Sequence, residues 1–302
     1  MMKKLRLGIM LLLGFSLNLS NPTFAQDDLL KMLEGEVVRE KEVEFVSATF
    51  KTTRIIHGQS VEVIAPGNLN FLIQHRFGKI NDGFQEFFGL DQATIRLGFE
   101  YGIVKNLNIG IGRSSFQKTY DGYLKYKMLQ QSSGKQNFPM SVVLYTGMAM
   151  QGTKWVEPDR VNYTSSRMLY SFQVLLARKF SNALSIQLMP SMIHRNLVET
   201  VEDQNDVFAI GAGGRLKISN RISFNAEYYY QLPGSNADKT YNSVAIGFDI
   251  ETGGHIFQLH VTNSKGMIEP YFISQTAGDI SNGDLYFGFN INRVFTLRKQ
   301  KQ

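Results

Sequence analysis

Charged side chains recur at every second position along several stretches of the sequence, and apolar residues occupy the positions between them. Charged groups that share one face of a sheet can form cross-strand ion pairs. When such groups surround a passage, rings of charge set its ion selectivity instead. The residues of this polar face, predicted to line a common interior, are Arg76, Arg96, Glu100, Asp121, Lys125, Lys127, Arg215, Glu227 and His260.

The five histidines lack the partners that a catalytic site needs. A nucleophilic Ser requires a His within hydrogen-bond distance, yet none of the five is followed two residues later by Ser. His260 shares a strand face with Thr262, but no acid is placed to orient its imidazole. We therefore expect no enzyme activity.

Metal and cofactor sites are not predicted either. The chain has no Cys, and its histidines are too scattered for ligand spacing. One cluster remains, formed by Arg113, Ser114 and Lys118 in a short link between two predicted strands. It is a candidate ligand site in a loop. The alternative is that the same residues only stabilise the turn through hydrogen bonds.

Strands are predicted to carry the charged face, and residues 93–128 show the pattern most clearly. Apolar residues alternate there with polar or small ones at a period of two. Ile95, Leu97 and Phe99 fall on one face, and Arg96 and Glu100 fall on the other. A helix of 3.6 residues per turn would mix the two sets, so the pattern indicates strands. A turn is expected at residues 105–106, after which the alternation restarts.

Twelve stretches of this kind follow one another along the chain, and together they predict an all-β protein. Long apolar side chains alternate on them with polar or small residues, except on the fifth, whose second face, with Val143 and Tyr145, is nearly as apolar as the first. The apolar faces of the twelve begin at Leu69, Ala93, Leu107, Tyr120, Met140, Met168, Leu184, Phe208, Ile222, Val244, Phe257 and Leu285.

The amino end has the pattern of a secretory signal peptide. Lys3, Lys4 and Arg6 precede an apolar run that ends at Ala25. Cleavage there removes three basic residues, so the formal charge of +6 falls to +3. That charge is small and evenly spread, and nucleic acid is not an expected partner.

The connections between the strands decide how the sheet is closed. Short turns and longer polar links alternate along the chain, with one exception at the link after Arg113. Bacterial outer-membrane barrels show this alternation and an even strand number. The connections of a Greek-key sandwich are not expected to alternate between short and long. The sequence predicts an antiparallel transmembrane β-barrel of about 12 strands, with a range of 10 to 14, that spans residues 68–302.

Residues 26–67 are predicted to form a periplasmic N-terminal extension or a lumen segment. The first part is acidic and poor in aromatics, but residues 45–64 are too rich in β-branched side chains for a linker. This part is expected to be ordered, either as an extra strand or as a segment inside the barrel. In the second case Lys51 and Arg54 would meet acids of the lumen.

Several sequence blocks resemble an uncharacterised family of membrane-bound β-barrels found in Bacteroidota-type outer membranes. The blocks are TTRIIHGQSVEV, IQHRFG, FFGLDQATIRLGFEYGI, GRSSFQKTYDGYLKYKMLQQ and NSKGMIEP. They extend from about Thr52 to the end of the chain. The resemblance implies a barrel in the outer membrane and names no catalytic residue.

These observations lead to a channel or binding barrel for a small solute in the cell outer membrane. The first four strands carry more basic than acidic residues on the polar face, which would give a narrow passage that weakly favours anions. The alternative is a non-conducting scaffold barrel that docks a periplasmic protein through residues 26–67. An outer-membrane hydrolase is the weakest of the three hypotheses. The other expected partner is outer-membrane lipid.

Overall fold

The computed structural model describes residues 42–155, 157–198, 200–234 and 240–298. The predicted signal peptide, residues 1–25, lies outside these residues, as does most of the acidic lead-in. Residues 44–302 form one compact unit. Within its described part, no helix is long and apolar enough to cross a membrane.

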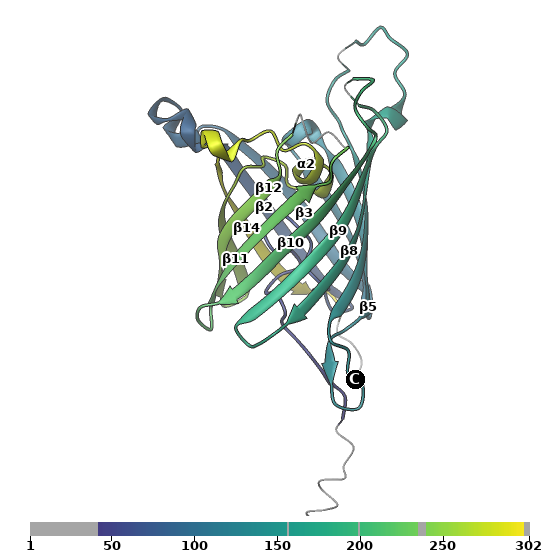
Figure 1. Ribbon diagram of the computed structural model, residues 1–302, viewed down its shortest axis with the longest axis vertical. Helices are drawn as coiled ribbons and strands as arrows, with labels where there is room; N and C mark the ends of the chain where they lie inside the picture. The colour runs from purple at the N-terminus through teal and green to yellow at the C-terminus, as the bar shows by residue number, and fades with distance from the viewer. Residues whose placement is uncertain (1–41, 156, 199, 235–239, 299–302) are drawn as a thin grey trace, which may run out of the picture. The chain divides into compact units, whose positions relative to one another are not determined.

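Twelve antiparallel strands close into a barrel, which confirms the predicted fold class (Figure 1). Each strand pairs with the next along the chain, and β14 pairs with β2 to close the ring. The strands are β2 (Asn68–Lys79), β3 (Ala93–Val104), β4 (Leu107–Ser114), β5 (Tyr120–Leu129), β7 (Ser141–Met150), β8 (Met168–Lys179), β9 (Leu184–Arg195), β10 (Asp206–Lys217), β11 (Ile222–Gln231), β12 (Ser243–Thr252), β13 (His255–Thr262) and β14 (Tyr286–Thr296).

The predicted alternation is present in the burial of the strands. On β3, Ile95, Leu97 and Phe99 are 40–44% exposed, whereas Arg96 and Glu100 are 1–2% exposed. The large apolar side chains therefore point outward, and the charged ones point into the barrel. This arrangement is the reverse of a soluble barrel, and it suits a wall that is surrounded by lipid.

The two ends of the barrel differ in their connections. One end, called here the short-turn end, carries the links at residues 105–106, 130–140, 180–183, 218–221 and 253–254. It also carries a two-stranded sheet of β1 (Glu44–Phe45) and β6 (Ser132–Ser133). The other end, called the long-loop end, carries short 3₁₀ turns: η1 (Ile80–Asp82), η2 (Phe84–Gly89), η3 (Phe116–Lys118), η4 (Thr164–Arg167) and η5 (Ile280–Asn282).

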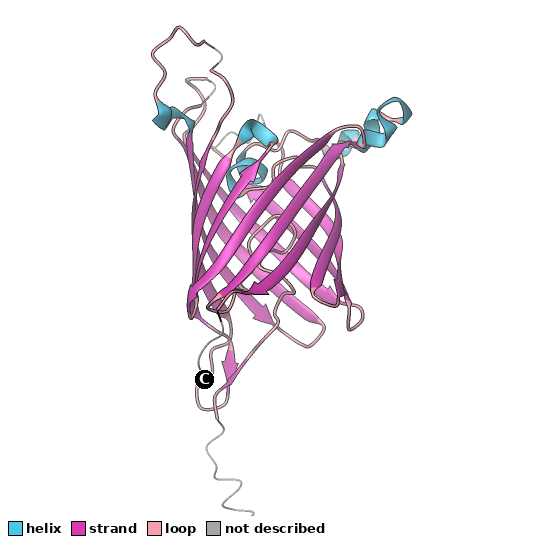
Figure 2. Ribbon diagram, turned by 180° about the vertical axis from the view of Figure 1, so that it is seen from behind, coloured by secondary structure: helices cyan, strands magenta, loops and turns pink. Residues whose placement is uncertain are grey.

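Residues 46–66, called here the plug, lie inside the barrel and are not a further strand of its wall. The side chains of residues 49–61 are almost all buried. The backbone turns back on itself, because Ile55 N–H donates to Gly58 and Ser60 N–H donates to Thr53, at 2.8 and 2.9 Å. Figure 2 shows this chain as a loop within the strands.

A second segment enters the lumen from the long-loop end. The link between β13 and β14, residues 263–285, contains the short helix α2 (Glu269–Ser274), and all six helical residues are buried. Figure 1 shows α2 inside the upper part of the barrel. The sequence leaves open whether residues 265–282 of this link form an outer loop or a further hairpin segment; in the structure, the apolar residues of α2 pack in the lumen.

The interior is divided into an apolar and a polar side. An apolar cluster joins the inner face of β7–β11 to plug and α2 residues. The cluster consists of Phe50, Ile55, Val61, Val143, Leu175, Ala177, Met189, Ile193, Val207, Ala209, Tyr229, Phe272 and Ile273. The remaining wall, chiefly β2–β5 and β12–β14, presents charged and amide side chains to the plug.

Candidate functional site

The centre of the lumen is an ion pair between the plug and α2. Arg54 Nη1 donates to Glu269 Oε1 at 3.1 Å, and both side chains are 1% exposed. Tyr145 of β7 and Gln59 of the plug also donate to this carboxylate, at 2.7 and 3.1 Å. A buried carboxylate is tolerated when its lone pairs are filled in this way. Glu269 therefore connects the plug, α2 and the wall.

Glu227 of β11 holds the tip of the plug. Its carboxylate accepts backbone N–H groups of Ile56, His57 and Gly58, at 3.2, 2.7 and 3.2 Å. These donors form a concave turn that faces the negative charge, as in backbone anion nests. A Cβ on Gly58 would lie 3.1 Å from Tyr229 Cζ, so the close approach requires glycine.

Arg76 of β2 meets the same tip from the polar side. Its guanidinium donates to His57 Nε2 at 3.3 Å, to the His75 carbonyl at 2.7 Å and to Asn290 at 3.0 Å. The rings of His57 and His260 are edge to face, with centroids 5.7 Å apart. Asn290 in turn donates to the Ile56 carbonyl at 2.9 Å. Together with Glu227 of β11, side chains of β2 and β14 thus hold the plug tip through hydrogen bonds.

Arg96 forms the second ion pair of the interior. Its Nε donates to Asp121 Oδ1 at 2.9 Å and its Nη1 donates to Gln74 at 2.9 Å. Gly98 and Gly112 leave the room that the guanidinium fills, since a Cβ on Gly112 would lie 2.8 Å from Arg96 Nε. The lumen-facing glycines of the strands therefore make space for large side chains, which the alternation in the sequence does not reveal.

The lysines and the remaining charges on the polar face also contact the plug or its surroundings. Lys125 Nζ donates to the Thr53 carbonyl at 2.9 Å. Arg215 donates to the carbonyls of Ala48 and Thr49, at 3.1 and 3.3 Å. Lys51 of the plug pairs with Glu251 near the short-turn end. Lys127 is 7% exposed, and Glu100 accepts from Asn108 at 3.1 Å.

The loop cluster predicted from the sequence forms a turn. Ser114 Oγ accepts the N–H of Phe116 at 3.1 Å, and Lys118 N–H donates to Ser115 at 3.1 Å. The Arg113 guanidinium lies 4.7 Å from the centroid of the Tyr120 ring. The Ser114 hydroxyl and the Lys118 backbone N–H are thus used within the turn.

Outside the strands, the loop between α2 and β14 is anchored by Asp284. Its carboxylate pairs with Lys79 at 2.8 Å and accepts from Asn81 at 2.9 Å. These hydrogen bonds lower the pKa of Asp284 to about 2. The loop that carries α2 is thereby fixed to the end of β2.

In the described ranges, no three His, Asp or Glu residues are grouped to hold a metal ion.

Comparison with protein families gives one match, and it covers most of the chain. Residues 50–295 match the model of a domain described as a membrane bound beta barrel domain (DUF5777). The chain belongs to this family. The family model includes the plug from residue 50 onward as well as all twelve barrel strands.

A comparison with solved structures gives matches of low similarity. The NanC porin is 10% identical, with a TM-score of 0.47 over 76% of this chain and 98% of the porin. The KdgM porin is 9% identical, with a TM-score of 0.45 over 76% and 99%. The outer membrane protein Omp33 of Acinetobacter baumannii is 8% identical, with a TM-score of 0.40 over 78% and 100%. A comparison with curated proteins found no match.

Sequence reasoning missed the residue at the centre of the lumen, Glu269. Its signal in the sequence is a single acid in an otherwise largely apolar run, Met267–Ser274. This run lies in a link whose structure, outer loop or further hairpin segment, the sequence leaves open. The neutral partners Gln59, Tyr145 and Asn290 were also missed, because amides and phenols carry no charge pattern. By contrast, all nine residues predicted for the polar face have inward-directed, largely buried positions in this barrel.

Proposed function

We propose that this family member is an outer-membrane barrel that passes or binds a small solute, and that the plug closes the lumen in this structure. The observation that carries the proposal is the path of the plug. It enters and leaves by the short-turn end, where Val46 N–H donates to Gln131 and Gly67 N–H donates to Gly102, at 2.8 and 2.9 Å. A hairpin inserted from one end can withdraw without threading.

The contacts of the plug support a reversible closure. The plug forms hydrogen bonds with Glu227, Asn290 and Glu269. Its other contacts are the ion pair between Arg54 and Glu269 and the apolar packing of Ile55. Water can replace the hydrogen bonds when the lumen opens, so the net contribution to closure is about 1 kcal/mol for the bond to Asn290 and about 1.5–3 kcal/mol for each bond to a carboxylate. Withdrawal would leave a lumen lined by Arg76, Arg96 and other charged groups, which suits a polar solute.

The experiment is sugar uptake into vesicles that contain the mature protein. Removal of residues 46–66 should increase the rate of vesicle swelling with small sugars, because the lumen loses its main filling. The control is the same deletion protein tested with a sugar polymer too large for the lumen. Absence of swelling with small sugars, in a deletion protein that still resists heat as a folded barrel, would favour the non-conducting scaffold.

A further inference from the structure

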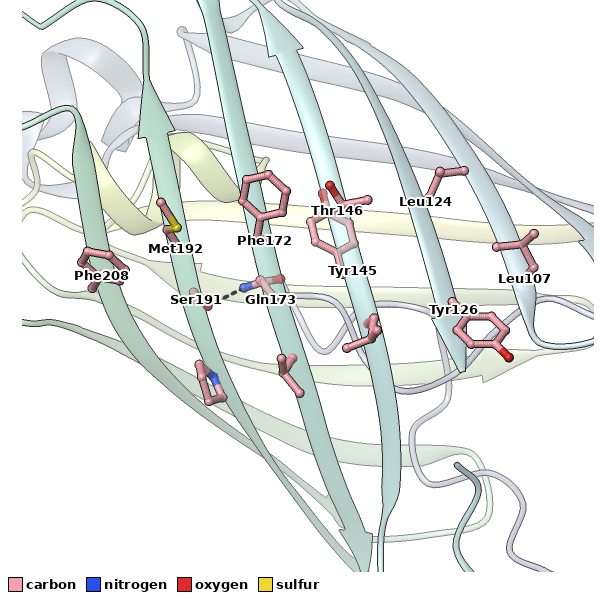
Figure 3. A pocket seen from close by; sticks show the side chains of 13 residues that line it. Leu107, Leu124, Tyr126, Tyr145, Thr146, Phe172, Gln173, Ser191, Met192 and Phe208 are labelled. Carbon is pink, nitrogen blue, oxygen red and sulfur yellow. Dashed lines mark hydrogen bonds between the residues drawn. The ribbon is translucent and has the colours of Figure 1, made fainter. Parts of the chain in front are cut away.

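The outer wall of the barrel carries an apolar depression across β7–β9. It has a volume of about 650 Å³, within the range of small-molecule sites. Three of its lining residues have smaller side chains, Thr146, Val174 and Pro190, and they are called here the floor. Figure 3 shows Thr146 between the larger side chains of Phe172 and Leu124. The surrounding residues are Leu107, Leu124, Tyr126, Leu144, Phe172, Met192 and Phe208.

The strand pairing is interrupted beneath this depression. The pairing of β8 with β9 includes Gln173 opposite Ser191 and Leu176 opposite Leu188, but the two positions between them are unpaired. Pro190 lies in this gap and has no N–H to donate. The depression also reaches the backbone of the wall, because its lining includes Tyr145, Gln173 and Ser191, whose side chains point inward.

The gap is stabilised from the lumen side. Gln173 Nε2 donates to Ser191 Oγ at 2.8 Å, as the dashed line in Figure 3 shows. Ser191 Oγ in turn donates to the Met189 carbonyl at 2.8 Å. Leu175 and Met189 are fully buried in the apolar cluster behind the gap. The interruption therefore faces lipid on one side and a packed apolar interior on the other.

We propose that this depression binds one acyl chain of a membrane lipid. The depression is continuous with the lipid-facing wall, where Phe172 and Phe208 are 46% and 48% exposed. Its lining is almost entirely apolar, and a flexible chain in this volume would contact side chains of several strands. A flat part of the wall offers contact on one side only, so dispersion and apolar burial are larger in the depression.

The test uses tryptophan fluorescence in detergent micelles. Trp155→Phe removes the single native Trp, and Phe172→Trp then places a probe in the depression. The matched control is Phe248→Trp on β12, which is also lipid-facing and 45% exposed but lies outside the depression. The ligand is a phosphatidylcholine with dibrominated stearoyl chains, titrated into maltoside micelles that contain each variant.

A binding site should give saturable quenching in the Phe172→Trp variant, half-complete at a lipid fraction about fivefold lower than in the Phe248→Trp variant. Filling the floor with Val174→Phe and Thr146→Leu should remove this difference. Coincident curves for the two variants would overturn the proposal, and so would a Phe172→Trp curve that the filled floor leaves unchanged. Neither result depends on whether the lumen conducts, so the acyl-chain site and the solute passage are tested separately.

Discussion

Arg54 and Glu269 form an ion pair at 3.1 Å in the middle of the barrel, and both side chains are 1% exposed. Arg54 belongs to the plug, which enters from the short-turn end, and Glu269 begins α2, which enters from the long-loop end. The two segments that fill the lumen thus meet at one charge pair. If the plug closes the lumen as proposed, we expect this contact to be central to the closure.

Glu269→Gln should loosen the plug. The substitution leaves the buried Arg54 guanidinium without a carboxylate, and loss of one partner from such a pair costs about 3–5 kcal/mol. We expect a lower unfolding midpoint and faster amide hydrogen exchange in residues 50–61. Glu251→Gln is the matched control, because Glu251 also pairs with a plug residue, Lys51, but is half exposed. Its effect should be about 0–1 kcal/mol.

Gly112→Ala should destabilise the barrel by about 1–3 kcal/mol, because the added Cβ displaces the Arg96 guanidinium from its pair with Asp121. The control is Gly122→Ala, whose Cβ would lie 3.7 Å from its nearest neighbour, the Gly110 carbonyl oxygen. This control should be neutral or slightly stabilising, since Ala loses less entropy than Gly in a strand. Equal unfolding midpoints for the two variants would show that the space over Gly112 is not needed.

We expect the ion selectivity of the opened barrel to depend on the basic excess of the polar face. In a barrel without residues 46–66, Arg96→Gln combined with Lys125→Gln should shift the reversal potential toward cations. The reason is that Glu100 and Glu227 would remain in the interior with fewer basic neighbours. Reversal potentials in a salt gradient measure the shift. An unchanged reversal potential in a conducting barrel would show that Arg96 and Lys125 do not line the passage.

The Asp284 anchor should hold over the whole mildly acidic range. Its pKa is lowered to about 2, so the stability it contributes is present above the ordinary carboxyl value and is lost as the pH falls through 2. Amide exchange in residues 276–285, corrected for intrinsic rates, should be the same at neutral pH and at about pH 5. Asp284→Asn should raise the corrected exchange rate of these residues at both pH values. Loosening of the native loop at the lower pH would contradict this account of the anchor.

The fold was predictable from the sequence because each wall strand has a single buried face. Alternation around Ile95, Arg96 and Leu97 separates the two faces of the strand, and the turn at residues 105–106 is found where it was expected. The alternation does not say which face points inward; that step rests on the sorting of short turns and long links, which is typical of a membrane barrel. On β7 both faces are apolar, with Val143 inside and Leu144 outside, and the pattern alone does not separate them. The structure resolves this, because Val143 belongs to the apolar cluster of the lumen.

The positions of the two segments inside the lumen, the plug and α2, could not be predicted from the sequence in the same way. The plug has no strict period, so the sequence leaves open whether residues 45–64 form a strand or a lumen segment. Its conformation depends on contacts that are more than a hundred residues away, such as Glu227 with His57. The same holds for α2, whose position depends on Arg54 and Tyr145. Contacts of this kind have no local signature.

Single-channel conductance of the mature protein in a planar bilayer tests the closed-lumen account most directly. Three proteins should be compared: the unmodified chain, Glu269→Gln, and a chain that lacks residues 46–66. We expect the unmodified protein to be closed with rare openings, Glu269→Gln to open more often, and the deletion protein to conduct steadily. A deletion protein that keeps its heat-resistant β-structure and stays silent would contradict a passage that the plug closes.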